Sequence, residues 1–100
     1  MNDPQPTVPE ELRTTYTMIR CAFPTEIPAD AYFPLLAILC EAMSFRGAAQ
    51  TIVFFGGDYV QYLNDVFAAC STEAPAELEV QHVKALLMRC GYQAWLDESA

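Results

Sequence analysis

The chain has 100 residues, 53% of them hydrophobic, and thirteen acidic against five basic residues give it a net charge of −8. This length corresponds to one domain, and the apolar content excludes a disordered chain because it can supply a core. The acidity disfavours binding to nucleic-acid phosphates or to anionic membranes, whereas it suits a basic partner. The composition therefore predicts one small, soluble, globular domain.

The amino-terminal segment 1–6 carries two prolines among polar residues. We expect it to be a disordered tail before a single helical domain over residues 7–100. It has neither the basic region nor the apolar stretch of a signal peptide. The longest strongly apolar run, residues 31–40, is interrupted by Pro34 and is too short to cross a bilayer. We therefore expect a cytoplasmic protein.

The four cysteines lie far apart along the chain, at Cys21, Cys40, Cys70 and Cys90. In a cytoplasmic protein we expect them to be reduced and buried as small hydrophobic residues, and we predict no disulfide. Zinc ligands usually come in close pairs, and the single histidine, His82, excludes a multi-histidine metal site. Arg20 and Arg89 each precede a cysteine, but adjacent helical residues point in different directions, so no reactive thiol is expected.

The first expected helix begins near Thr7, which forms a capping-box pattern with Glu10 and places Pro9 in the first turn. Apolar residues then recur every three or four positions, which is typical of one helix face. These residues are Leu12, Tyr16, Ile19 and Phe23. Pro24 ends this helix because proline cannot continue the backbone hydrogen bonding.

The second expected helix begins near Asp30 and places Pro34 in its first turn, because proline deeper inside a helix breaks backbone hydrogen bonds. Its residues leave almost no polar face, which is typical of a central helix. The third expected helix covers residues 45–55, with Ser44 as its cap. Residues 51–55 are the one β-like window, which we interpret as helix. We expect these two helices to be the most buried.

Glycine and proline mark the boundaries in the second half of the chain. Gly56 and Gly57 end the third helix, because glycine readily adopts the left-handed conformation, and Asp58 caps the fourth. Pro75 suits the first turn of the fifth helix, which Gly91 ends. The expected apolar faces are Tyr59, Leu63, Val66, Phe67 and Cys70, then Leu78 (or Val80), Val83, Leu86, Leu87 and Cys90. The remaining chain can fold back as one helical turn, giving an all-α bundle of about five short helices.

Few polar residues are candidates for chemistry, and each also has a structural interpretation. His82 and Glu79 could shuttle a proton, yet the pattern fits a half-exposed surface histidine. Glu77 and Glu79 suit the first turn of a helix through the helix dipole, rather than a metal site. The glycine turn before Asp58 has no nearby Lys or Arg and no phosphate-loop motif. We predict no catalytic, cofactor-binding or metal-binding residue, and no cofactor.

Aromatic residues bracket the glycine turn at Phe54, Phe55, Tyr59 and Tyr62. They cannot all face one core, and exposed aromatic rings are common in protein interfaces. We name Phe54, Tyr59 and Tyr62 as a candidate interface and hypothesise a non-enzymatic protein-interaction module, self-association included. One alternative is a helix-turn-helix-like nucleic-acid-binding protein, which the acidity disfavours. The other is a small ligand-binding protein or enzyme.

One stretch resembles a known family. Residues 20–39 read RCAFPTEIPADAYFPLLAIL, with an aromatic-proline pair, a second proline, and Tyr32 before a Pro-Leu-Leu-Ala run. This pattern resembles the small helical actinobacterial proteins grouped as domain of unknown function 3349, over roughly residues 13–93. Family members often carry Asp directly before the tyrosine, where this chain has Ala31. The resemblance implies a compact helical bundle and a bacterial cytoplasmic protein, and it supplies no functional residues.

Overall fold

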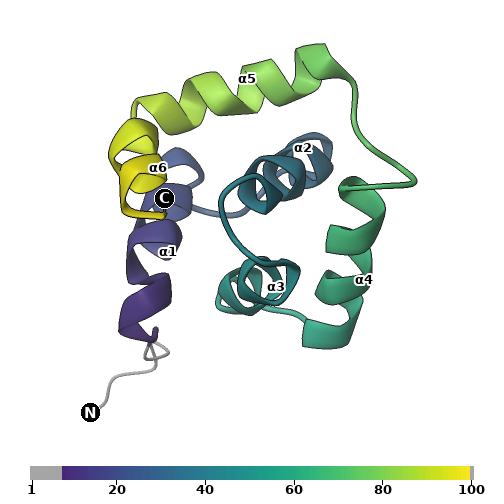
Figure 1. Cartoon of the computed structure of the whole chain (residues 1–100), viewed down its shortest axis with the longest axis horizontal. Helices are drawn as coiled ribbons and strands as arrows, with labels where there is room; N and C mark the ends of the chain where they lie inside the picture. Colours follow the sequence, from purple (N-terminus) through teal and green to yellow (C-terminus); the bar gives the residue numbers. More distant parts are fainter. Residues whose placement is uncertain (1–7, 100) are drawn as a thin grey trace.

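The computed structural model describes residues 8–99, which form six helices and contain no strand over that range (Figure 1). The helices are α1 Glu10–Ala22, α2 Ala29–Cys40, α3 Phe45–Val53, α4 Tyr59–Ala69, α5 Glu77–Met88 and α6 Tyr92–Ser99. The predicted all-α class is confirmed, but the count of about five was too low. The additional helix, α6, is the segment that we expected to form a single turn. The expected tail 1–6 and the expected cap Thr7 lie outside the described residues.

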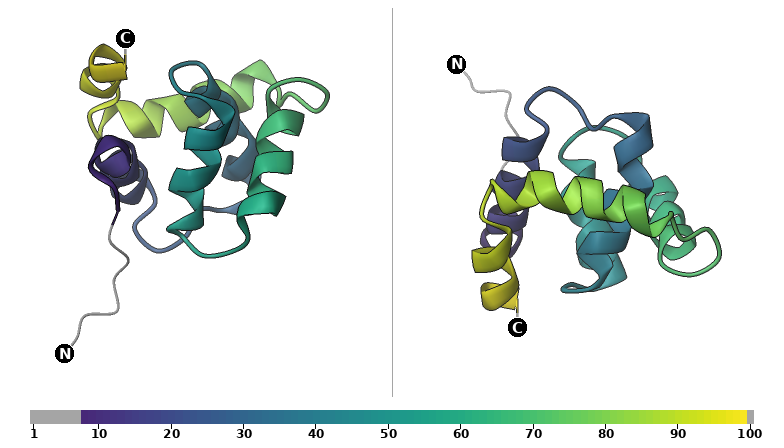
Figure 2. Two further views of the ribbon diagram at one scale, coloured as in Figure 1. Left: turned by 60° about the horizontal axis from the view of Figure 1, so that its bottom comes forward. Right: turned by 90° about the horizontal axis from the view of Figure 1, so that it is seen from above.

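The helices form a bundle in which α2 is surrounded by α3, α4 and α5 (Figure 1). The most extensive helix-to-helix contact joins α3 and α4, followed by the contacts of α2 with α5 and with α4. α1 and α6 lie side by side at the opposite end of the bundle from α4 (Figures 1 and 2). The two helices expected to be central, α2 and α3, therefore contact each other less than each contacts α4.

Pro34 lies deeper in α2 than predicted. The helix begins at Ala29, so Pro34 is in its second turn rather than its first. Proline has no N–H, so the Asp30 carbonyl loses its usual intrahelical donor, and an interior proline costs roughly 3 kcal/mol. Four aliphatic side chains of α2 are fully buried, Leu35, Leu36, Ile38 and Leu39. Burial stabilises by about 1.5–3 kcal/mol for each, which outweighs the cost of the proline.

Two predicted helix caps are confirmed. The hydroxyl of Ser44 accepts a hydrogen bond from the Gly47 N–H at 3.0 Å, at the start of α3. The carboxylate of Asp58 accepts from the Gln61 N–H at 3.0 Å, at the start of α4. Both glycines of the turn between these helices, residues 56–57, have positive φ angles of 101° and 113°. The local sequence therefore fixes this turn, as predicted.

The starts of α1 and α5 differ from the prediction. Their N-cap positions are occupied by Pro9 and Ala76, neither of which has a side chain that accepts a hydrogen bond. Pro9 and Pro75 consequently precede the first helical turns instead of lying inside them. Glu77 and Glu79 do lie in the first turn of α5, where the helix dipole favours their negative charge, as predicted.

Two residues assigned to the core are exposed. Phe67 on α4 is 50% exposed, and Leu78 on α5 is 78% exposed. Ala69 is buried on α4 instead, and Val80, the alternative to Leu78, packs against the core. Phe67 lies edge-on against Phe45, with ring centroids 4.7 Å apart. The size of an apolar side chain alone therefore does not predict whether it is buried.

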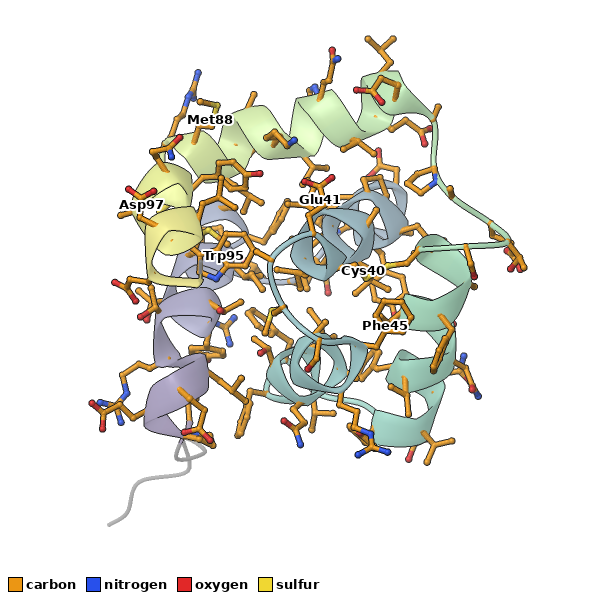
Figure 3. The ribbon with its side chains drawn as sticks, viewed as in Figure 1. Cys40, Glu41, Phe45, Met88, Trp95 and Asp97 are labelled. Atoms are coloured by element: carbon orange, nitrogen blue, oxygen red, sulfur yellow. A yellow bond between two sulfur atoms is a disulfide. The ribbon has the colours of Figure 1, made fainter. Side chains whose placement is uncertain are left out.

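α6 completes the core. Its Tyr92 and Trp95 are 5% and 1% exposed and belong to the same buried cluster as α2 and α3. Trp95 lies on the side of α6 that faces the rest of the bundle (Figure 3). This helix is therefore an integral part of the domain.

All four cysteines are paired, so the prediction of reduced thiols is wrong. Cys21 bonds to Cys90, with Cα atoms 5.8 Å apart, and Cys40 bonds to Cys70, with Cα atoms 6.7 Å apart. Cys40 lies on the α4 side of α2 (Figure 3). Cys21 is in the last turn of α1, Cys90 follows α5, Cys40 ends α2 and Cys70 is the C-cap of α4. Each bridge thus joins the carboxyl ends of two helices that are distant in sequence.

Candidate functional site

An open groove of about 340 Å³ separates the start of α1 from the α3–α4 turn. Its walls include Glu11, Leu12, Gln50, Val53, Phe54 and Tyr59. We call it the Phe54–Tyr59 groove. Two of the three predicted interface residues, Phe54 and Tyr59, therefore lie in the same concave surface.

The glycine turn explains how these two rings come together. Phe54 is the C-cap of α3, and Tyr59 is the first residue of α4. The positive φ angles at residues 56–57 reverse the chain between them. The ring of Phe54 also lies edge-on to Tyr16 of α1, with centroids 6.3 Å apart. The glycine turn thus places Phe54 and Tyr59 on one wall of the groove, and Tyr16 of α1 packs against the Phe54 ring from the side.

The other wall of the groove could not be predicted. Leu12 is 7% exposed, which agrees with its predicted place in the core, and its small exposed part lines the groove. Glu11 lies in the first turn of α1 and carries the negative charge of this wall. No local pattern links residues 9–12 with residues 53–59, because only the packing of α1 on α3 brings them together.

Tyr62, the third predicted interface residue, does not line this groove. Its hydroxyl donates a hydrogen bond to the Gly56 carbonyl, and its ring centroid is 6.1 Å from that of Tyr32. A Cβ atom at Gly57 would collide with its ring. Tyr62 instead lines a separate pocket of about 160 Å³ that it shares with Phe55. Its contacts therefore support the glycine turn.

Arg20 binds α1 to the far side of the same turn. Its guanidinium carbon lies 4.5 Å from the ring centroid of Phe55 and 5.4 Å from that of Tyr16. Its Nη2 donates to the Tyr16 hydroxyl at 2.9 Å, and its Nη1 donates to the Pro24 carbonyl at 3.2 Å. Cation–π contacts of this kind contribute about 0.5–2 kcal/mol. One of the few basic side chains is therefore used to hold the aromatic residues in place.

A hydrogen bond between Tyr32 and Asp65 joins α2 to α4. The Tyr32 hydroxyl donates to Oδ2 of Asp65 at 2.7 Å, and Gln61 Nε2 donates to Oδ1 at 3.1 Å. Burial raises the pKa of Tyr32 well above its ordinary value of 10.0, and the bond to Asp65 and its charge raise it further. At neutral pH this phenol is therefore a structural donor rather than an acid that releases its proton.

His82 is exposed, rather than half-exposed as expected, and lines a groove of about 200 Å³ together with Asp30 and Glu79. The sequence placed Glu79 three residues before His82 as a possible proton-transfer partner, whereas Asp30 is added by the packing of α2 on α5. The groove is smaller than the 300–1,000 Å³ typical of ligand sites. Over residues 8–99, no group of three or more His, Cys, Asp and Glu residues is arranged to hold a metal ion.

Charged groups are mostly unpaired on the described surface. Residues 8–99 contain one ion pair, in which Lys84 Nζ lies 3.9 Å from Glu41 Oε1. Both side chains are partly exposed, so this pair contributes at most about 1 kcal/mol. The remaining carboxylates, including Glu11 in the Phe54–Tyr59 groove, give the domain an acidic field.

Comparison with known proteins gives no assignment. We find no match between this chain and any protein-family model, curated protein or solved structure. The resemblance of residues 20–39 to domain of unknown function 3349 therefore stays a prediction. In the structure this segment runs from the end of α1 into α2, and several of its residues, such as Phe23, Leu35 and Leu36, are buried. None of the six helices that the structure describes combines the length and apolarity needed to span a bilayer.

Proposed function

We propose that this protein is a non-enzymatic interaction module that binds a basic, apolar segment of a partner protein in the Phe54–Tyr59 groove. The observation that carries the proposal is the convergence of Phe54, Tyr59 and Leu12 on one open groove of about 340 Å³. Aromatic side chains that are partly accessible within a concave surface, as Phe54 and Tyr59 are, are typical anchors of protein interfaces.

Charge supports a basic partner. The net charge is −8, and Glu11 lies in the groove itself, next to Glu10 in the first turn of α1. Opposite charge accelerates association and favours the correct partner, and salt weakens this effect. The same field repels a phosphate backbone, which disfavours the helix-turn-helix alternative.

The cysteines also bear on the compartment in which this partner is met. The expected cytoplasmic location stays a prediction, and the disulfides Cys21–Cys90 and Cys40–Cys70 weigh against it. Bridges of this kind are rare in reducing compartments and common in oxidising ones. We therefore favour an oxidising compartment, where such bridges form.

The proposal is tested by NMR titration of the isotope-labelled protein with two synthetic peptides. Both peptides share a leucine-rich centre, which lysines flank in one and glutamates in the other. The lysine peptide should shift the resonances of residues 11–12 and 53–59, and it should bind at least roughly tenfold more tightly than the glutamate peptide. Added salt should reduce this difference.

Variants of single residues locate the binding site. Tyr59→Ala should weaken binding of the lysine peptide by roughly tenfold or more. Leu78→Ala is the matched control, because it removes an apolar side chain that is 78% exposed on α5, outside the groove. Tyr62→Ala is unsuitable because it would disturb the glycine turn. Equal binding by the Tyr59 and Leu78 variants would contradict the proposal. A dimer that Tyr59→Ala dissociates would assign the groove to a second copy of the chain instead.

A further inference from the structure

The two disulfides lie in different surroundings. Cys21 is exposed and lies outside the core cluster, whereas its half-buried partner Cys90 packs against the core and also lines an open groove of about 440 Å³. Cys40 and Cys70 are both half-buried and both pack against the core. Of the two bridges, only Cys21–Cys90 therefore has an exposed half-cystine.

The groove beside Cys90 is open to a small molecule. It lies between α1 and the α5–α6 turn, with Glu10 and Arg13 on its α1 wall. Gly91 follows Cys90 in this groove, and a Cβ atom placed on it would meet no other atom within 4 Å. The groove therefore gives a small molecule room beside Cys90, and the opposite charges of Glu10 and Arg13 leave its entrance without a strong net charge to repel an anion.

We propose that Cys21–Cys90 is a site of thiol–disulfide exchange with a small thiol or dithiol, and that Cys40–Cys70 is a structural bridge. Exchange begins when a thiolate attacks the sulfur of Cys21, the exposed half-cystine of the bridge, and the S–S bond breaks. Cys90 leaves as a thiolate and takes a proton from water, while Cys21 forms a mixed disulfide with the reagent. The second thiol of a dithiol then attacks the reagent's own sulfur and releases Cys21, so the reagent is oxidised and both cysteines are reduced.

Reduction at this site removes the covalent link between the end of α1 and the α5–α6 turn. Cys40–Cys70 continues to tie α2 to α4, so the change is confined to one end of the bundle. Trp95 of α6 is the only tryptophan in the chain and is 1% exposed. Its fluorescence therefore reports on how firmly α6 stays packed after the exchange.

The experiment exposes the oxidised full-length chain to dithiothreitol for increasing times and then blocks free thiols with an alkylating reagent. Peptide mapping by mass spectrometry identifies the labelled cysteines. Cys21 and Cys90 should be labelled together, roughly tenfold or more faster than Cys40 and Cys70, because exposed bridges are the labile ones. Helical circular dichroism should persist during the fast phase, and Trp95 emission should shift to longer wavelength with the same time course.

A double variant separates the two bridges. In C40S/C70S, the labelling rate of Cys21 and Cys90 should match the wild-type rate. If that variant does not fold, peptide mapping of the wild-type chain alone tests whether the two bridges are labelled at different rates. Equal rates for both bridges, faster labelling of Cys40 and Cys70, or loss of helicity in step with the first labelling would overturn the proposal. Four free thiols in the protein as isolated from its own cells would also overturn it.

Discussion

The indole nitrogen of Trp95 donates a hydrogen bond to the hydroxyl of Thr15 at 2.7 Å, across 80 positions of sequence. Both residues are buried, at 1% and 4% exposure. Over residues 8–99, every buried side-chain nitrogen or oxygen atom has a hydrogen-bond partner, and this bond satisfies two of them. The bond also joins α6 to α1 and, together with the burial of Tyr92 and Trp95, holds this helix of eight residues in place.

Replacement of Thr15 tests this bond. Thr15→Val keeps the shape of the side chain but leaves the buried indole N–H without an acceptor, which should cost about 1–3 kcal/mol of unfolding free energy. Thr15→Ser keeps the hydroxyl and removes only a methyl group, so it is the matched control. Urea unfolding monitored by circular dichroism measures both. A serine variant less stable than the valine variant would show that the methyl group matters more than the hydrogen bond.

Removal of the disulfides should destabilise the fold substantially. The bridges close loops with sequence separations of 69 and 30 residues. Loop-closure entropy then predicts a loss of roughly 4 kcal/mol for each bridge. Thermal unfolding of C21A/C90A and of C40A/C70A should show lower melting temperatures than the wild-type chain, and full reduction should lower the melting temperature further. An unchanged melting temperature after full reduction would contradict a structural role for either bridge.

Two glycines with similar backbone conformations should respond differently to alanine. Gly57 and Gly91 have φ angles of 113° and 94°, so alanine is strained at both, by roughly 1–2 kcal/mol. A Cβ atom at Gly57 would also collide with the Tyr62 ring, whereas one at Gly91 would meet open space. Gly57→Ala should therefore lose more unfolding free energy than Gly91→Ala in urea titrations. Equal losses would mean that the Tyr62 ring moves aside without cost.

Local chemistry explains which parts of the fold could be predicted. The cap at Ser44, the cap at Asp58 and the reversal at residues 56–57 each depend on a few adjacent residues, so the sequence pattern suffices. Proline fixes a helix start only to within about one turn, because it tolerates several positions there. Pro34 lies in the second turn of α2 because the burial of the surrounding aliphatic side chains outweighs the loss of one backbone hydrogen bond.

Tertiary packing explains what could not be predicted. The cysteines have no local pattern, and the pairing of Cys21 with Cys90 depends on how α1 meets the α5–α6 turn. Leu12 lies in the Phe54–Tyr59 groove only because α1 packs beside α3. Tyr62 belonged to the predicted aromatic cluster, but its hydrogen bond to Gly56 places it elsewhere. A sequence pattern shows which residues are aromatic and does not show which other element they will meet.

Stability should fall at high pH because of Tyr32. Burial and the bond to Asp65 raise the pKa of this phenol above its ordinary value of 10.0, so the folded state holds the proton more tightly than the unfolded state. The stability that Tyr32 contributes to the folded state is therefore complete below about pH 10, the unfolded pKa, and is lost as the pH rises above that value. Urea midpoints of the wild-type chain should drop as the pH rises above about 10.

Tyr32→Phe separates this effect from other alkaline changes. The variant lacks the titrating hydroxyl, so its urea midpoint should be lower at neutral pH but should fall less steeply over the same range. Both proteins carry the same disulfides and the same other tyrosines, so these groups affect the two curves alike. Equal slopes for the two proteins would show that Tyr32 loses its proton as readily in the folded chain as in the unfolded one.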